Sequence, residues 1–347
     1  MEHKQLSKEI SWLRFPLIFL IILLHCYSTV SIPGNHATYF KLVYPFSLWL
    51  GETGVPGFFF ISGFLFFLSQ KSYKNKLKTR INTLLIPYIL WNGILTLAYL
   101  ASYFLGYPQD INGKNVSEYD LVDYARLFWD RGSYDNGNFV PILCPLWYIR
   151  NLLIMSVLSP VFYYLIKYSG ELFLAAIAIW WMTTYHNAFI QQTVLFFCLG
   201  AYFSIHKIDP LRHTIRFKTL FLMLCIVFAL GDIFTHTIYS ISINLQIHRL
   251  ALLFNIPTML LIANYCTKKG LSSSTLSNSA FIVFATHYPI VVVLRKFCAS
   301  QFANSSDLTH VLLYWACVLI ATISSIGVYI ILNKYFPKTK NILSGRR

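Results

Sequence analysis

The chain has 347 residues, of which 56% are hydrophobic and only 12% are charged, and its formal net charge is +15. Soluble domains carry about 25% charged residues, so this composition excludes an ordinary soluble protein and predicts one polytopic membrane domain over residues 1–347. The seven cysteines are scattered through the sequence without metal-ligand spacing, so we expect free thiols and no metal site.

The predicted fold class is all-α, a bundle of about ten transmembrane helices, because about 20 apolar residues in a helix cross a bilayer core of roughly 30 Å. The first stretch follows ten polar residues and lacks a small-residue cleavage site, so we expect a retained helix rather than a signal peptide. The fifth and sixth stretches are divided at His186-Asn187. The ten stretches are 11–31, 44–69, 81–105, 146–166, 171–185, 189–205, 219–239, 249–266, 278–298 and 309–333.

Lysine and arginine residues collect in alternate loops. If the N-terminus is cytoplasmic, 20 of the 28 fall on the cytoplasmic side, and the one long acidic loop, about 107–145, lies outside. This bias predicts that both termini are cytoplasmic, with a short tail at about 334–347. The positive charge is therefore a signal of topology, and we expect no nucleic-acid binding.

Two ionisable side chains interrupt the first stretch, Arg14 and His25. Eleven residues make about three helical turns, so both point from one face, about 16 Å apart along the axis. Charged groups inside a membrane usually face a protein interior or an aqueous cavity. The alternative is that Arg14 reaches the cytoplasmic headgroups and His25 is a core histidine.

The second stretch contains Glu52, Ser62 and several glycines, of which Gly63 predicts close approach of a neighbouring helix. Glu52 and His25 lie at similar depths on adjacent antiparallel spans, so the two can meet. The alternative places Glu52 in a solvated outer vestibule. Glu52 and Ser62 are candidate substrate-binding residues.

A basic loop, residues 71–80, separates the second and third stretches. Such a loop usually anchors the topology on anionic lipid. Its cations equally suit the phosphates of a nucleotide, since lysine supplies point charge and arginine a two-pronged donor. The candidate phosphate-binding residues are Lys74, Lys76, Lys78 and Arg80.

Later stretches add further candidates. Trp147 and Arg150 open the fourth stretch, and His287 lies at mid-membrane in the ninth; all three are candidate substrate-binding residues. Asp232 and His236 lie one turn apart near the outer end of the seventh stretch, where we expect a local hydrogen bond.

These segments together resemble the membrane acyltransferase-3 family, which O-acylates bacterial surface polysaccharides and related glycans. The resemblance covers essentially the whole chain, and its motifs appear in family order. They are Arg14 and His25 at the R-x10-H spacing, Gly54-Val-Pro56, Phe58-Phe-Phe-Ile-Ser-Gly-Phe-Leu65, Arg80 before Ile86-Pro-Tyr88, Leu146-Trp-Tyr148, Phe197-Cys-Leu-Gly200, and Ser279-Ala-Phe281 with His287-Tyr-Pro289.

The resemblance implies a multi-pass protein of the bacterial inner membrane that uses cytoplasmic acyl-CoA, with acetyl-CoA as the expected donor, and a glycan or lipid-linked saccharide acceptor. His25 would act as the base or carry the acyl group itself, because histidine titrates near neutrality. Arg14 would hold a CoA phosphate or the carbonyl end, since arginine stays charged. The rival reading is a polysaccharide exporter, because intramembrane charges and broken helices also serve transport. A third interpretation is a structural or sensory membrane protein.

Overall fold

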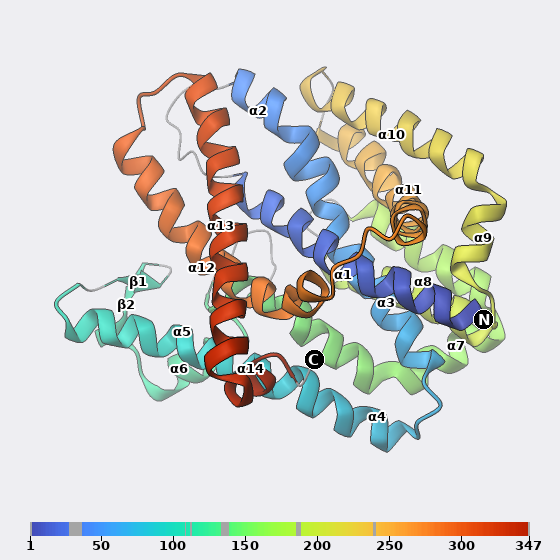
Figure 1. Ribbon diagram of the computed structural model, residues 1–347, viewed down its shortest axis with the longest axis horizontal. Helices are drawn as coiled ribbons and strands as arrows, with labels where there is room; N and C mark the ends of the chain where they lie inside the picture. The colour runs from blue at the N-terminus through green and yellow to red at the C-terminus, as the bar shows by residue number, and fades with distance from the viewer. Residues whose placement is uncertain are drawn as a thin grey trace.

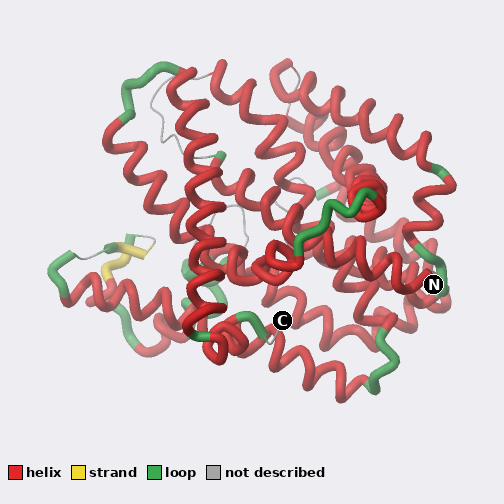
Figure 2. The backbone as a smooth tube through the Cα atoms, viewed as in Figure 1, coloured by secondary structure: helices red, strands yellow, loops and turns green. Residues whose placement is uncertain are grey.

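The computed structural model describes residues 2–27, 37–107, 109–111, 113–132, 139–184, 189–238 and 241–345. This part of the chain is almost entirely helical, with one short antiparallel strand pair (Figure 2), so the all-α class is confirmed. The elements are α1 (Glu2–Cys26), α2 (Ala37–Tyr44), α3 (Gly54–Leu68), α4 (Tyr73–Arg80), α5 (Ile86–Phe104), β1 (Asp110–Ile111), β2 (Lys114–Asn115), α6 (Leu121–Arg126), α7 (Trp147–Thr183), α8 (Phe189–Ile205), α9 (Pro210–Arg216), α10 (Lys218–Ile238), α11 (Ile241–Lys268), α12 (Ser274–Gln301), α13 (Asp307–Tyr335) and α14 (Pro337–Leu343).

The helices identify a multi-pass membrane protein. Within the described residues, eight helical segments are long and apolar enough to cross a membrane, and the pair α8–α9, bent by 94°, makes a ninth if it counts as one span. This number is lower than the ten predicted stretches because the fourth and fifth fall in one helix, α7. The predicted division at His186-Asn187 lies outside the described residues.

Helix α7 folds back on itself at Ser169, whose backbone angles (φ −135°, ψ 28°) are not helical. A straight helix of 37 residues would be about 55 Å long. Yet Trp147, at its start, stacks on Phe189, just beyond its end, with ring centroids 4.0 Å apart. The chain from Thr183 to Phe189 spans at most about 21 Å. The two arms must therefore meet at a sharp angle, and they correspond to the fourth and fifth predicted stretches.

Helix α1 runs through the middle of the bundle, between α3 and α12 (Figure 1). Its contacts with α12 advance in the same direction along both helices, since Ser11 bonds Ser277 and His25 packs on His287, so the two helices are parallel. We call the side on which α1 and α12 begin the terminal face, and the opposite side the distal face. Helix α13 returns from the distal face to the terminal face.

Helices α3 and α8 cross with their backbones in direct contact. A Cβ atom on Gly63 would lie 2.0 Å from the carbonyl oxygen of Phe197, and a Cβ atom on Gly200 would lie 2.0 Å from that of Phe60. Only glycine fits at such a contact, and small residues of this kind let membrane helices approach closely. The predicted close approach at Gly63 is confirmed.

The prediction that the basic segment is a loop is wrong. Residues Tyr73–Arg80 form helix α4, which continues through a π-helical turn, Ile81–Leu85, into α5. Helical order fixes the directions of these cations: Lys74 and Lys78 are exposed, whereas Lys76 and Arg80 are partly buried.

The acidic segment between α5 and α7 packs into a small unit on the distal face. Its own apolar cluster consists of Ile111, Val116, Leu127 and Ile142. Lys114 donates a hydrogen bond to the carboxylate of Asp123, which raises the pKa of the lysine and lowers that of the aspartate. This unit positions the residues of one cavity described below.

Candidate active site

Arg14 and His25 both face α12, as the helical spacing predicts. Arg14 lines a cavity with Ser277 and Phe281 of that helix, and His25 contacts His287 and Tyr288 further along it. Because α1 and α12 are parallel, the arginine lies nearer the terminal face and the histidine nearer the distal face. The alternative in which Arg14 only reaches toward lipid headgroups does not fit this placement.

Two histidines meet near the distal end of α1. The ring centroids of His25 and His287 are 5.4 Å apart, and Tyr288 presents its ring edge-on to His25 at 5.0 Å. His287 is completely buried, whereas His25 is only half-buried.

The hydrogen bonds of His287 define its tautomer. Its Nδ1 lies 3.1 Å from the backbone carbonyl oxygen of Val283, which can only accept, so Nδ1 carries the proton. Nε2 is then an acceptor, and within the described residues this buried atom has no hydrogen-bond partner. A buried polar atom without a partner is costly, so its place beside His25 points to a functional role.

A cavity of about 280 Å³ opens toward the terminal face, and we call it the terminal cavity. Two arginines from different helices line it, Arg14 of α1 and Arg80 of α4, and none of the described residues around it is acidic. Ser62 also lines it and bonds the hydroxyl of Tyr148 at 3.1 Å. The terminal cavity thus offers two guanidinium groups and a hydroxyl pair to an anionic, oxygen-rich ligand.

Lys76 and Arg80 share one aromatic ring. The Lys76 ammonium lies 5.0 Å from the centroid of Phe66, and the Arg80 guanidinium lies 5.4 Å from it. Lys76 faces a second hollow of about 680 Å³ lined by Phe67, Tyr163 and Lys207 among others, which we call the aromatic groove. Cations on both sides of Phe66 therefore extend the basic surface from the terminal cavity into this groove.

A third cavity, the distal cavity, has a volume of about 770 Å³ and lies between α5, α12 and the acidic segment. Tyr288 lines it and touches His25. On the other side, Phe284 lines the terminal cavity and its ring centroid is 6.1 Å from that of His287. The two histidines consequently lie between two cavities, the terminal cavity on one side and the distal cavity on the other.

Comparison with known proteins identifies this arrangement. The sequence pattern of the acyltransferase domain, the acyltransferase-3 type, matches residues 7–333. The chain belongs to this family. The succinoglycan biosynthesis protein ExoH of Rhizobium meliloti (strain 1021) is 24% identical over 367 aligned residues, which cover 98% of this chain and 92% of that protein. No solved structure matches the chain.

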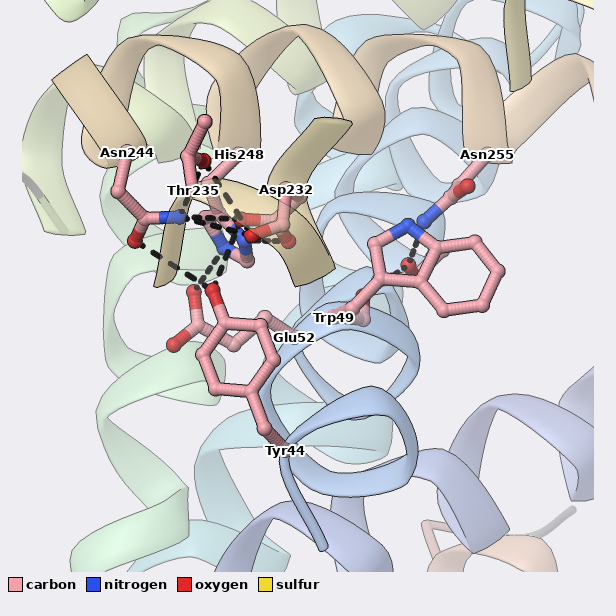
Figure 3. A network of polar contacts seen from close by, with 9 residues as sticks. Tyr44, Trp49, Glu52, Asp232, Thr235, Asn244, His248 and Asn255 are labelled. Atoms are coloured by element: carbon pink, nitrogen blue, oxygen red, sulfur yellow. Dashed lines mark hydrogen bonds and ion pairs between the residues drawn. The ribbon is translucent and has the colours of Figure 1, made fainter. Parts of the chain in front are cut away.

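The predicted contact between Glu52 and His25 is wrong for this acyltransferase. Glu52 pairs instead with His248 of α11, with 3.0 Å between Oε2 and Nε2 (Figure 3). The other ring nitrogen of His248 lies 2.9 Å from a carboxylate oxygen of Asp232. Glu52 lies in the 3-10 turn Gly51–Thr53 that precedes α3, and it is therefore held in a network with α10 and α11.

The expected local bond between Asp232 and His236 is also replaced by longer-range contacts. Asp232 is fully buried and accepts hydrogen bonds from Tyr44 at 2.8 Å and Asn244 at 2.9 Å (Figure 3). His236 stacks on Tyr44, with ring centroids 3.6 Å apart. Asp232 was found because it is an ionisable residue within an apolar stretch, whereas His248 lies one residue before the predicted stretch 249–266 and was missed.

Trp147 and Arg150 face away from the terminal cavity. Trp147 stacks on Phe189, and its neighbour Tyr148 is the motif residue that lines the cavity. Arg150 donates hydrogen bonds to the backbone carbonyls of Trp129 at 2.6 Å and Phe139 at 2.9 Å. The arginine thus anchors the acidic segment to α7 through these hydrogen bonds.

Proposed function

We propose that this membrane acyltransferase moves an acyl group, which we take to be acetyl, from acyl-CoA to a hydroxyl of a cell-surface or lipid-linked glycan. The observation that carries the proposal is the position of His25 and His287 between the terminal and distal cavities. A donor entering from one face and an acceptor entering from the other meet at this pair. The glycan acceptor is supported by the relative that is named for succinoglycan biosynthesis.

The terminal cavity is the proposed donor site. The phosphates of CoA need cations, and Arg14 and Arg80 supply them in a cavity whose described lining residues include no carboxylate. Lys76 adds a cation in the adjoining aromatic groove, whose lining also includes Asp209. The asymmetry of lysine and arginine supports a cytoplasmic location for this face, on the side where acyl-CoA is made. We therefore propose that both termini are cytoplasmic and that the membrane is the bacterial inner membrane.

His25 is the proposed base. It takes the proton of the acceptor hydroxyl while the hydroxyl oxygen bonds to the thioester carbonyl carbon. The bond from carbon to sulfur then breaks, and the departing thiolate of CoA receives the proton. While His25 is protonated, the unpaired Nε2 of His287 can accept a hydrogen bond from it, which stabilises the charged form.

The test uses acyl-CoA labelled in its acyl group and inverted membrane vesicles that contain the protein. His25→Ala should lower label transfer by about 10²-fold or more, the usual contribution of a general base. His287→Ala should lower it less. The matched control is His310→Ala, which removes a histidine of α13 that is 2% exposed and should leave the rate within a few-fold of wild type.

Three results would oppose the proposal in different ways. Wild-type transfer by His25→Ala would remove His25 from the chemistry. Label that stays on the protein when no acceptor is present would show a covalent acyl-histidine in place of a base. Glycan movement across the membrane without any labelling would favour the exporter instead.

A further inference from the structure

The distal cavity is basic on a face where positive charge is scarce. Only eight lysine and arginine residues fall on the side predicted to be external: Lys41, Lys114, Arg126, Arg131, Arg150, Arg249, Arg295 and Lys296. Three of these eight, Arg131, Arg295 and Lys296, line this one cavity. Their concentration opposes the charge bias that sets the topology, so it calls for a separate reason.

Of the five cations on this side that do not line the cavity, four make contacts within the protein. Lys114 pairs with Asp123, and Arg126 lies 3.9 Å from Asp130. Arg150 binds backbone carbonyls of the acidic segment, and Arg249 binds those at the end of α7. These four cations serve contacts within the protein.

Two cations of the distal cavity, Arg295 and Lys296, are arranged differently. None of the described residues that line the cavity is acidic, and Lys296 bonds only a neutral group there, the side-chain oxygen of Gln109, at 2.8 Å. Within the described part of the chain, no carboxylate forms an ion pair with Arg295. Positive charge gathered in a cavity without a carboxylate is an anion site by its chemistry.

The cavity also adjoins the reacting groups. Tyr288 lines the cavity and presents its ring edge-on to His25, with the two ring centroids 5.0 Å apart. Its volume, about 770 Å³, falls within the range of sites for small molecules. Tyr99, Ser102 and Ser300 add hydroxyl groups that suit a sugar.

We propose that the distal cavity binds an anionic group of the acceptor, through Arg295 and Lys296 with Arg131, and so presents a neighbouring hydroxyl to His25. This inference rests on the proposed function, and it narrows the acceptor class to a glycan that carries a carboxylate or a phosphate. The charge comes either from an acidic sugar or from the pyrophosphate that links a saccharide to a lipid. Both offer oxygen anions to the same cations.

The experiment measures equilibrium binding to the full chain in nanodiscs of neutral lipid. One pair of probes is a fluorescent oligogalacturonate and a neutral galacto-oligosaccharide of equal length, and the other is farnesyl pyrophosphate and farnesol. The double variant Arg295→Gln/Lys296→Gln should weaken binding of an anionic probe about tenfold or more, the effect of losing a charge-assisted bond. The neutral probes should show no change.

Controls separate the cavity from general surface charge and from misfolding. Lys41→Gln removes an exposed cation from the same face outside the cavity and should leave binding unchanged. Arg295→Lys keeps the charge but loses the planar pair of donors, so it should retain more of the affinity than the double variant. Loss with the oligogalacturonate identifies an acidic sugar, and loss with farnesyl pyrophosphate identifies the lipid link.

The inference is overturned if the wild type binds neither anion better than its neutral counterpart, or if Lys41→Gln weakens binding as much as the double variant. Acyl transfer is measured on the same preparations from labelled acyl-CoA. Absence of transfer in the wild type would count against the proposed function, whereas transfer with unaltered binding in the double variant would count against this inference alone.

Discussion

The crossing of α3 and α8 predicts that a substitution at Gly63 destabilises the protein, and the distances at the crossing give the magnitude of the loss. In Gly63→Ala the new Cβ atom would lie 2.0 Å from the carbonyl oxygen of Phe197 and 2.9 Å from its carbonyl carbon. Ordinary contacts of this kind begin at 3.4 Å. The obstacle is backbone, which cannot rotate away as a side chain can, so the two helices must separate by more than about 1 Å.

Overpacking of a tight interior typically costs about 1–3 kcal/mol, and a backbone obstacle puts this variant at the upper end of that range. We therefore expect Gly63→Ala to lose about 3 kcal/mol of stability, which lowers the unfolding midpoint by several degrees in a chain of this size. The same displacement moves Ser62, the preceding residue, away from the hydroxyl of Tyr148, now 3.1 Å away. Acyl transfer per folded molecule should fall as well.

The assay is thermal unfolding of the purified protein in nanodiscs, followed by tryptophan fluorescence, with transfer measured on the folded fraction. The matched control is Gly93→Ala in α5, where no atom lies within 4 Å of the new Cβ. Alanine is the better helix former by about 0.5–1 kcal/mol, so this control should unfold no earlier than wild type. A wild-type midpoint for Gly63→Ala would refute the reasoning about the helix crossing.

Two further predictions concern the donor side and the topology. Arg14→Lys keeps the charge but loses the planar pair of donors, so transfer should fall at least tenfold in matched amounts of folded protein, and a wild-type rate would return Arg14 to a structural role. In a background without the native cysteines, a cysteine in place of Asn115 should react with a membrane-impermeant thiol reagent on intact cells, whereas one in place of Asn75 should not; the opposite pattern would invert the topology.

The sequence alone determined the features that depend on local spacing. Hydrophobic runs of sufficient length predict membrane helices whatever their neighbours are, and the helical period alone puts Arg14 and His25 on one face. The tight crossing at Gly63 was also readable, because a residue without a side chain in an apolar helix marks a close contact. These are properties of a single segment.

Tertiary structure decided which groups meet across the bundle. Glu52 and His248 are 196 residues apart, and the choice of His248 over His25 as the partner of Glu52 depends on which side of the 3-10 turn Gly51–Thr53 faces α11. The fold-back of α7 at Ser169 likewise appears only when Trp147 and Phe189 are seen to stack. Neither follows from composition or period.

The same limit applies to the reacting groups. His287 was a minor candidate in the sequence, and its importance comes from a neighbour 262 positions earlier in the chain, His25, and from the carbonyl that fixes its tautomer. Two cavities on opposite sides of this pair result from the packing of at least four helices. Helix formation is decided by each segment with its own backbone, whereas a site is decided by the relative rotation of helices, which the packing of all their side chains sets together.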